Sequence, residues 1–144
     1  QEGTSIAIRN PMSTRPWQHV LEPIRGYTML AKEIYKRGST RGLEALNFGP
    51  SNESNKTVQS LAEKVLEFWP GSWGQVLDHE VLHEAKLLSL NSDLAFHSLG
   101  WKGQWNFDKT IETTVGWYKA FHHDGDSAIA CCRRNINDYE SLFR

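Results

Sequence analysis

The chain has 144 residues, with 16 Lys or Arg, 17 Asp or Glu, and a formal net charge of −1. This balance gives no global reason to expect binding to nucleic acid. No apolar run approaches the roughly 20 residues that span a bilayer, and the start lacks the basic and apolar regions of a secretory signal. We therefore expect a cytoplasmic protein that binds neither nucleic acid nor membranes.

The first half of the chain alternates between extended and helical patterns, which is typical of an α/β domain. Gly38 is placed to end the first helix, and Thr57 is the expected N-cap of the second. The predicted elements are, in order, extended segments over 5–9 and 16–20, a helix over 22–37, a strand over 44–48, a loop over 51–56 and a helix after Thr57.

The second half continues the alternation and shows no linker, so we expect one domain over residues 1–144. Cys131 and Cys132 are adjacent, and we expect both to be reduced, because a disulfide between neighbours strains the peptide that joins them. The predicted elements are strands over 73–77 and 86–90, a short helix over 92–99, a helix from Phe107 or Asp108, and a last helix from Ser127.

Three polar residues on the predicted extended segments suit a phosphorylated ligand. Arg9 ends the first segment, and Arg15 precedes Pro16. Proline stiffens the backbone, so a guanidinium there can be held still for a diphosphate. Asn47 precedes Phe48 and Gly49, where an amide can donate to a phosphate while glycine permits close approach. The plainer alternatives are two surface arginines and an asparagine that caps its own turn.

Several short blocks of the sequence form one ordered pattern from end to end. They are Ile8–Pro11, Arg15–Val20, Leu21–Pro23, Gly26–Tyr27, Asn47–Pro50, His83–Ala85, Leu99–Trp101 and Trp117–Lys119. This pattern resembles the C-terminal half of CDP-glucose 4,6-dehydratases, which belong to the extended short-chain dehydrogenase/reductase family. The resemblance implies an α/β fold with a small mixed sheet and several helices. It also implies that the chain is the substrate lobe of such an enzyme, with the Rossmann lobe absent.

Two features that an NAD-dependent enzyme of that family needs are missing from the sequence. The glycines form no three-glycine strand-to-helix turn for the NAD pyrophosphate. No Tyr-x-x-x-Lys pair is present, since Ala31 stands four residues after Tyr27. We expect the chain to bind no NAD and to contain no catalytic residue of its own, whereas the intact family enzyme uses NAD. Gln1 as the first residue also suggests a fragment of a longer enzyme.

The resemblance assigns roles to five residues of a nucleotide-sugar site. It implies that Arg15 binds the diphosphate and that Arg9 lies near the nucleobase. It places Asn47, His83 and Glu84 around the nucleotide, where the imidazole can donate to a ribose hydroxyl or phosphate. The chain departs from the family pattern after Ala85, where Lys86 and Leu87 replace His-Tyr. The loss of that tyrosine hydroxyl predicts a changed affinity or nucleotide preference.

A competing motif overlaps this site. His79, Glu80 and His83 spell the His-Glu-x-x-His signature of zinc peptidases, in which two histidines bind the metal and the glutamate is the general base. The extended form of the motif needs Gly at position 86 and His at position 89, and the chain has Lys86 and Ser89. A zinc site at His79 and His83 is therefore kept only as an alternative.

The sequence predicts a lobe that binds a nucleotide diphosphate sugar and needs an N-terminal dinucleotide-binding lobe for catalysis. A stand-alone nucleotide-sugar-binding or scaffold protein is the other alternative. Because a separated lobe exposes a former interface, self-association is also expected.

Overall fold

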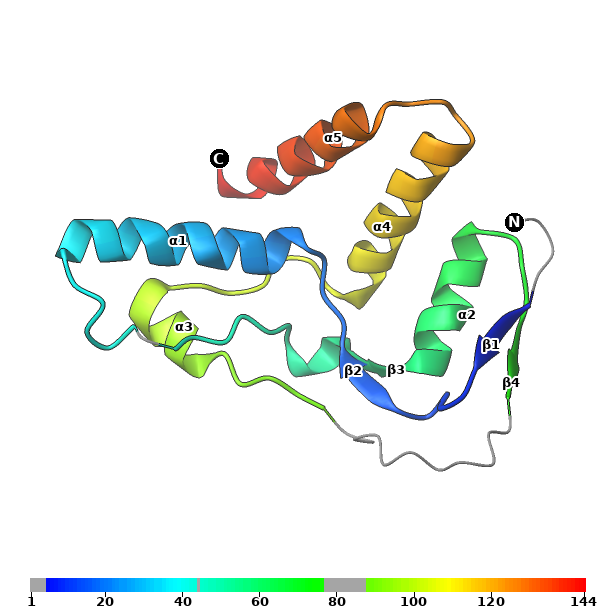
Figure 1. Ribbon diagram of the computed structural model, residues 1–144, viewed down its shortest axis with the longest axis horizontal. Helices are drawn as coiled ribbons and strands as arrows, with labels where there is room; N and C mark the ends of the chain where they lie inside the picture. The colour runs from blue at the N-terminus through cyan, green and yellow to red at the C-terminus, as the bar shows by residue number, and fades with distance from the viewer. Residues whose placement is uncertain (1–4, 44, 77–87) are drawn as a thin grey trace.

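The computed structural model describes residues 5–43, 45–76 and 88–144 (Figure 1). Over these ranges the chain forms an α/β arrangement of helices and short strands. The elements are β1 (Ile6–Ile8), β2 (Thr14–Pro16), α1 (Leu21–Arg37), the 3-10 turn η1 (Asn52–Ser54), β3 (Asn55–Thr57), α2 (Val58–Phe68), β4 (Trp73–Gln75), α3 (Asp93–Leu99), α4 (Phe107–His122), α5 (Ala128–Glu140) and the 3-10 turn η2 (Ser141–Phe143).

The described strands form two separate pairs, one parallel and one antiparallel. β1 pairs with β4 in parallel, with Ile6 opposite Trp73. β2 pairs with β3 in antiparallel register, with Arg15 opposite Lys56. The predicted α/β class with a small mixed set of strands is confirmed, although the two pairs do not join into one sheet among the described residues.

The first hydrophobic cluster lies between α1, α3 and the chain before Gly49. Phe48, Ala95 and Trp101 are its buried members, and Met29 and Leu30 of α1 pack against them. Gly26 permits the approach of α1, because a Cβ at this position would lie 2.5 Å from Cδ1 of Phe48.

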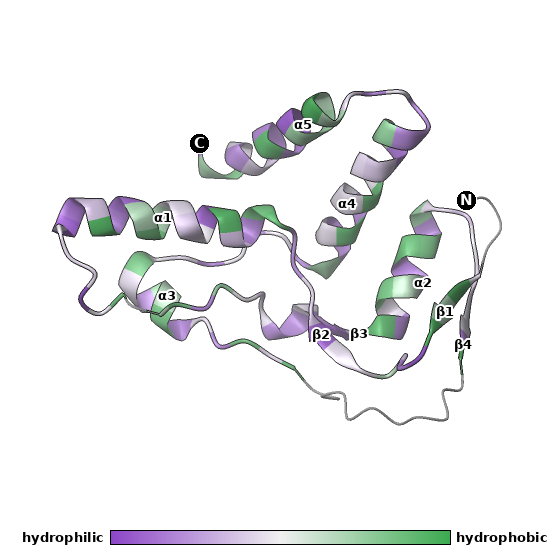
Figure 2. Cartoon of the chain, in the orientation of Figure 1, coloured by the Kyte–Doolittle hydropathy of each residue, from purple (hydrophilic) through white to green (hydrophobic). Residues whose placement is uncertain are grey.

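The second cluster lies between α2 and α4. Phe107, Ile111 and Val115 form one buried stripe of α4, and the hydrophobic residues of the two helices are visible in Figure 2. The α2 side chains that pack against this stripe include Leu61, Val65 and Phe68.

Polar contacts at the helix ends agree with the predicted boundaries. The Thr57 hydroxyl accepts a hydrogen bond from the Ser60 backbone N–H at 3.0 Å, which confirms it as the N-cap of α2. Gly38 and Gly100 end α1 and α3 with φ of 64° and 67°, in the left-handed region. Asn106 caps α4 through the backbone N–H of Lys109.

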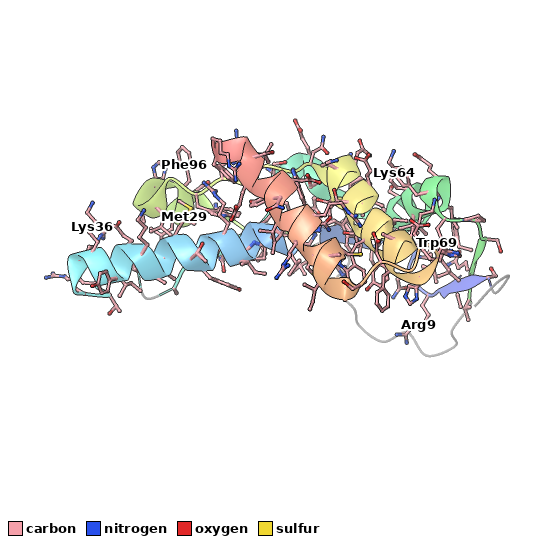
Figure 3. All side chains as sticks on the ribbon, turned by 90° about the horizontal axis from the view of Figure 1, so that it is seen from above. Arg9, Met29, Lys36, Lys64, Trp69 and Phe96 are labelled. Atoms are coloured by element: carbon pink, nitrogen blue, oxygen red, sulfur yellow. The ribbon has the colours of Figure 1, made fainter. Side chains whose placement is uncertain are left out.

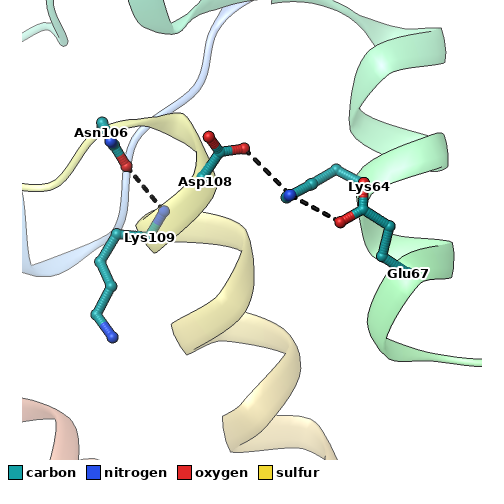
Figure 4. A network of polar contacts seen from close by, with 5 residues as sticks. All are labelled: Lys64, Glu67, Asn106, Asp108 and Lys109. Atoms are coloured by element: carbon teal, nitrogen blue, oxygen red, sulfur yellow. Dashed lines mark hydrogen bonds and ion pairs between the residues drawn. The ribbon is translucent and has the colours of Figure 1, made fainter.

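An ion pair also joins α2 to α4. Nζ of Lys64 contacts Asp108 at 3.4 Å and Glu67 of its own helix at 2.7 Å (Figure 4). The hydrogen bond to Glu67 is the main cause that raises the pKa of Lys64. This pair, in which the Asp108 side chain is largely exposed, adds little stability.

Four predicted elements of the sequence were wrong. The extended segment expected over 16–20 is the strand β2 at Thr14–Pro16, and residues 17–19 form no strand. Residues 45–48 and 88–90 form no strand, and the predicted loop over 51–56 contains η1 and most of β3. At Phe48 and Gly49, side chains form the hydrogen bonds that a neighbouring strand would otherwise form with the backbone. Gln18 Nε2 donates to the Phe48 carbonyl at 2.7 Å, and the Ser92 hydroxyl accepts from Gly49 N–H at 2.7 Å. An apolar run can thus pack as irregular chain when neighbouring side chains satisfy the hydrogen bonds of its backbone.

Among the described helices, none has the length and apolar character needed to cross a membrane.

Candidate functional site

Arg15 lies at the centre of the β2–β3 pair. Its Nη1 donates to the Thr14 carbonyl at 2.8 Å, and its Cα partner is Lys56. Trp17 fixes the end of the pair, because its indole Nε1 donates to the Lys56 carbonyl at 2.9 Å. The backbone that carries Arg15 is therefore held on both sides, as the proline after it led us to expect.

Asn47 is exposed and lies on a segment that is tied to the Arg15 segment. Gln18 stands three residues after Arg15, and its amide donates to the carbonyl of Phe48, the residue after Asn47. A chain extends at most about 3.6 Å per residue, so this single bond keeps the two backbones close. Arg15 and Asn47, which are 32 positions apart in the sequence, thus belong to neighbouring segments.

A third segment joins the same region. With its amide oriented to satisfy both neighbours, Asn55 donates to the Arg15 carbonyl at 3.1 Å and to the Leu88 carbonyl at 3.3 Å. Leu88 thus lies beside β2. The predicted site residues His83 and Glu84, and the alternative zinc ligands His79 and His83, lie outside the described residues.

Arg9 lies in a different place from Arg15. It follows β1, and a turn closed by the Ser13 N–H and the Asn10 carbonyl separates it from β2. Figure 3 shows Arg9 at the edge of the molecule near β1. It borders a groove of about 390 Å³ between β1 and α2, otherwise lined by Ile6, Ala7, Ile8, Asn10, Ser13, Val58, Leu61, Ala62 and Val65. Neither Arg15 nor Asn47 lines this groove.

A larger hollow begins where the Asn47 segment ends. We call it the α3 hollow; it measures about 570 Å³ and lies between three chain segments. Its described lining residues are Gly49–Asn52, Ser89–Asp93, Phe96 and Trp101–Gly103. Among the described residues, no group of three or more His, Cys, Asp or Glu could hold a metal ion.

A buried carboxylate that the sequence analysis did not single out organises the centre of the molecule. Glu22 is 1% exposed. Its Oε1 accepts from the backbone N–H groups of Gln104 at 2.9 Å and Trp105 at 2.7 Å, and its Oε2 accepts from the Tyr139 hydroxyl at 2.6 Å. Burial, followed by the hydrogen bond to Glu22, raises the pKa of Tyr139. The sequence feature that could have indicated this role is an acidic residue, Glu22, before a proline in the first turn of α1. The same feature is common at ordinary helix starts, so it does not predict a buried carboxylate.

His19 is a second buried polar residue next to this network. Its ring lies edge-on to Trp105, with centroids 4.8 Å apart, and its Nδ1 accepts from the Leu21 N–H at 3.3 Å. Burial lowers the pKa of His19 to about 4, so the imidazole is neutral at physiological pH. His19 therefore supports the start of α1 instead of offering a charge to a ligand.

No family model matches the chain. A curated protein, the CDP-glucose 4,6-dehydratase of Salmonella typhimurium, is 39% identical to it over 142 residues. The chain resembles the C-terminal part of a CDP-glucose 4,6-dehydratase. This confirms the resemblance found in the sequence motifs. The match covers 98% of this chain and 39% of the Salmonella dehydratase, so the chain spans well under half the length of the relative.

Proposed function

We propose that the chain is the nucleotide-sugar-binding lobe of an NAD-dependent 4,6-dehydratase that acts on a CDP-glucose-like substrate in the cytoplasm. The observation that carries this proposal is the 39% identity to a CDP-glucose 4,6-dehydratase over 98% of the chain. The arrangement of Arg15 and Asn47 on linked segments supports it. The cysteines, which are unpaired, suit a reducing compartment.

Binding would rest on charge-assisted hydrogen bonds from β2 and the segment before Gly49. The Arg15 guanidinium would fork across diphosphate oxygens, and the Asn47 amide would donate to the same group. Arg9, at the β1 groove, would lie toward the nucleobase. His83 and Glu84 remain the proposed contacts to the ribose side of the ligand.

The chemical steps would be assigned to a second lobe. When bound, NAD supplies the hydride acceptor and donor for such a reaction, and this chain contains neither the glycine-rich turn nor the Tyr-x-x-x-Lys pair that would use it. The role of the chain would be to bind and orient the sugar nucleotide against an N-terminal dinucleotide-binding lobe. We propose that this lobe is its partner.

The test is a titration of the purified chain with CDP-glucose, followed by NMR. We expect saturable binding that Arg15→Ala and Asn47→Ala each weaken by about tenfold or more, because charged hydrogen bonds contribute roughly 1.5–3 kcal/mol. Arg41→Ala is the matched control, since Arg41 is exposed and follows the end of α1 farthest from β2 (Figure 1). Equal weakening by Arg41→Ala would contradict the assigned site.

Catalysis is tested separately. With NAD and CDP-glucose the chain alone should release no 4-keto product, and addition of the purified N-terminal lobe of a related dehydratase should restore turnover. Turnover by the chain alone would contradict the division of labour between two lobes.

A further inference from the structure

We propose that the α3 hollow is a second ligand site, which binds a neutral, polyhydroxylated ligand of the saccharide class. Its volume of about 570 Å³ falls in the range of ligand pockets in proteins. None of Arg9, Arg15 and Asn47 lines it. The inference therefore stands apart from the nucleotide-sugar function.

The walls of the hollow are held in place before any ligand arrives. Ser92 bonds through its hydroxyl to both the N–H and the carbonyl of Gly49, at 2.7 and 3.3 Å. A Cβ on Gly49 would lie 2.5 Å from the Cβ of Leu90, so the two segments touch as closely as glycine allows. The lining segment Trp101–Gly103 is held by Glu22, which accepts from the Trp101 indole through its carbonyl and from Gln104 N–H through its carboxylate. A preorganised wall lowers the entropic cost of binding.

The lining combines an exposed aromatic ring with short polar side chains. Phe96 is 53% exposed and Leu90 39% exposed, and Figure 3 shows Phe96 on the side of α3 away from Met29 and α1. Ser51 and Asn52 add a hydroxyl and an amide to the lining. A lining that combines an apolar ring with neutral donors and acceptors suits a ligand with one C–H face and several hydroxyls.

The charges of the lining favour a neutral ligand over a phosphate. Among the described lining residues, Lys102 is the one cation and Asp93 the one anion, and no arginine is present. Phosphate recognition usually relies on several cationic donors. Hydroxyls, in contrast, can donate to the Asp93 carboxylate and accept from the Lys102 ammonium at once.

The experiment is a ¹⁵N-resolved NMR titration of the full chain with D-glucose and, separately, with inorganic phosphate. We expect glucose to shift the backbone signals of Ser51, Asn52, Lys102 and Gly103 in a saturable way, with a Kd in the millimolar range. Phosphate should leave these signals unchanged. Absence of saturable shifts with glucose, or shifts of these signals by phosphate instead, would overturn the proposal.

Variants locate the site within the hollow. Phe96→Ala should weaken glucose binding by about tenfold, because a lost aromatic contact contributes up to about 1.5 kcal/mol, and Asn52→Ala should also weaken it. Leu94→Ala is the matched control: Leu94 lies on the same helix, is also 53% exposed, and does not line the hollow. Arg15→Ala should leave the glucose response intact, even if it abolishes CDP-glucose binding. Equal weakening by Leu94→Ala would show that the hollow is not the site.

Discussion

At the scale of single residues, the buried Glu22 carboxylate connects distant parts of the chain. It lies in the first turn of α1 and satisfies two backbone N–H groups and one hydroxyl from parts of the chain more than 80 residues away. A buried charge of this kind is tolerated only when several donors surround it. Glu22 thus joins α1 to both the chain before α4 and the end of α5.

Glu22→Ala should lower the free energy of unfolding by about 3 kcal/mol or more, because it leaves three buried donors without an acceptor. Tyr139→Phe should cost less, since it removes one donor and leaves the other two in place. Urea denaturation measures both, and Glu33→Ala, which removes a partly exposed carboxylate of the same helix that pairs with Arg37, should have little effect. A loss no greater for Glu22→Ala than for Glu33→Ala would contradict the role of this carboxylate.

His19 predicts a pH dependence of stability. Its pKa is about 4 in the folded protein and 6.5 in an exposed state, so the unfolded chain binds more protons between these values. The free energy of unfolding should therefore fall as the pH is lowered from 6.5 to about 4, by at most about 3 kcal/mol. His19 should contribute almost no pH dependence above about pH 7.5, where the imidazole is neutral in both states.

The measurement is urea denaturation at several pH values across that window. His19→Gln should have a shallower decline than the unmodified chain, whereas His97→Gln, at an exposed histidine, should keep the full decline. Parallel curves for His19→Gln and the unmodified chain would contradict this origin of the pH dependence.

At the scale of elements, two glycines in helices should respond to the same substitution in opposite directions. Gly26→Ala in α1 should destabilise the protein by about 1–3 kcal/mol, because the new Cβ meets the Phe48 ring at 2.5 Å. Gly116→Ala in α4 should stabilise it by up to about 1 kcal/mol, because a Cβ there meets nothing within 4 Å and alanine favours helix. Thermal unfolding measures both changes, and shifts of the same sign would refute the close packing of α1 on Phe48.

The helices were the most predictable part of the fold, because the features that define them are local. Thr57, Gly38 and Gly100 mark helix ends through hydrogen bonds and backbone conformations that the nearby sequence determines. The strand predicted over 44–48 failed for the opposite reason. Gln18 and Ser92, which are distant in the sequence, satisfy the backbone of Phe48 and Gly49, and periodicity contains no signal of such partners.

The candidate site was predictable in part. Arg15 and Asn47 were proposed from stiff backbone and glycine neighbours, together with a family pattern, and the structure places them on linked segments. The sequence did not indicate that Gln18 links their segments. Nor did it predict that Arg9 lies at the β1 groove, which Arg15 does not line. Glu22 was missed because its burial depends on Trp105 and Tyr139, which no local pattern connects to it.

At the scale of the whole molecule, the exposed hydrophobic residues among the described ones include large aromatic side chains on α1 and α4. Tyr118 and Phe121 are 51% and 40% exposed near the end of α4, and Tyr35 is 91% exposed on α1. Tyr118 continues the buried stripe of Ile111 and Val115 by helical spacing. We propose that this end of α4 contacts the N-terminal lobe in an intact enzyme, and that copies of the isolated chain associate through it.

Sedimentation velocity should therefore show concentration-dependent association of the isolated chain. The double substitution Tyr118→Ser with Phe121→Ser should reduce this association. Tyr35→Ser, at a more exposed aromatic residue on another helix, should not. A chain that stays monomeric at all concentrations would refute the proposed contact.

The position of Glu22 has a consequence for how the protein is made. Its backbone partners at Gln104 and Trp105 follow it by 82 and 83 positions, and its hydroxyl partner Tyr139 by 117, so all three are synthesised well after it. Until then the carboxylate stays hydrated, so the nascent chain cannot complete its native packing around the start of α1. Loss of Tyr139 would leave this acid without its hydroxyl partner, and the damage would appear at the start of α1, 117 positions earlier in the sequence.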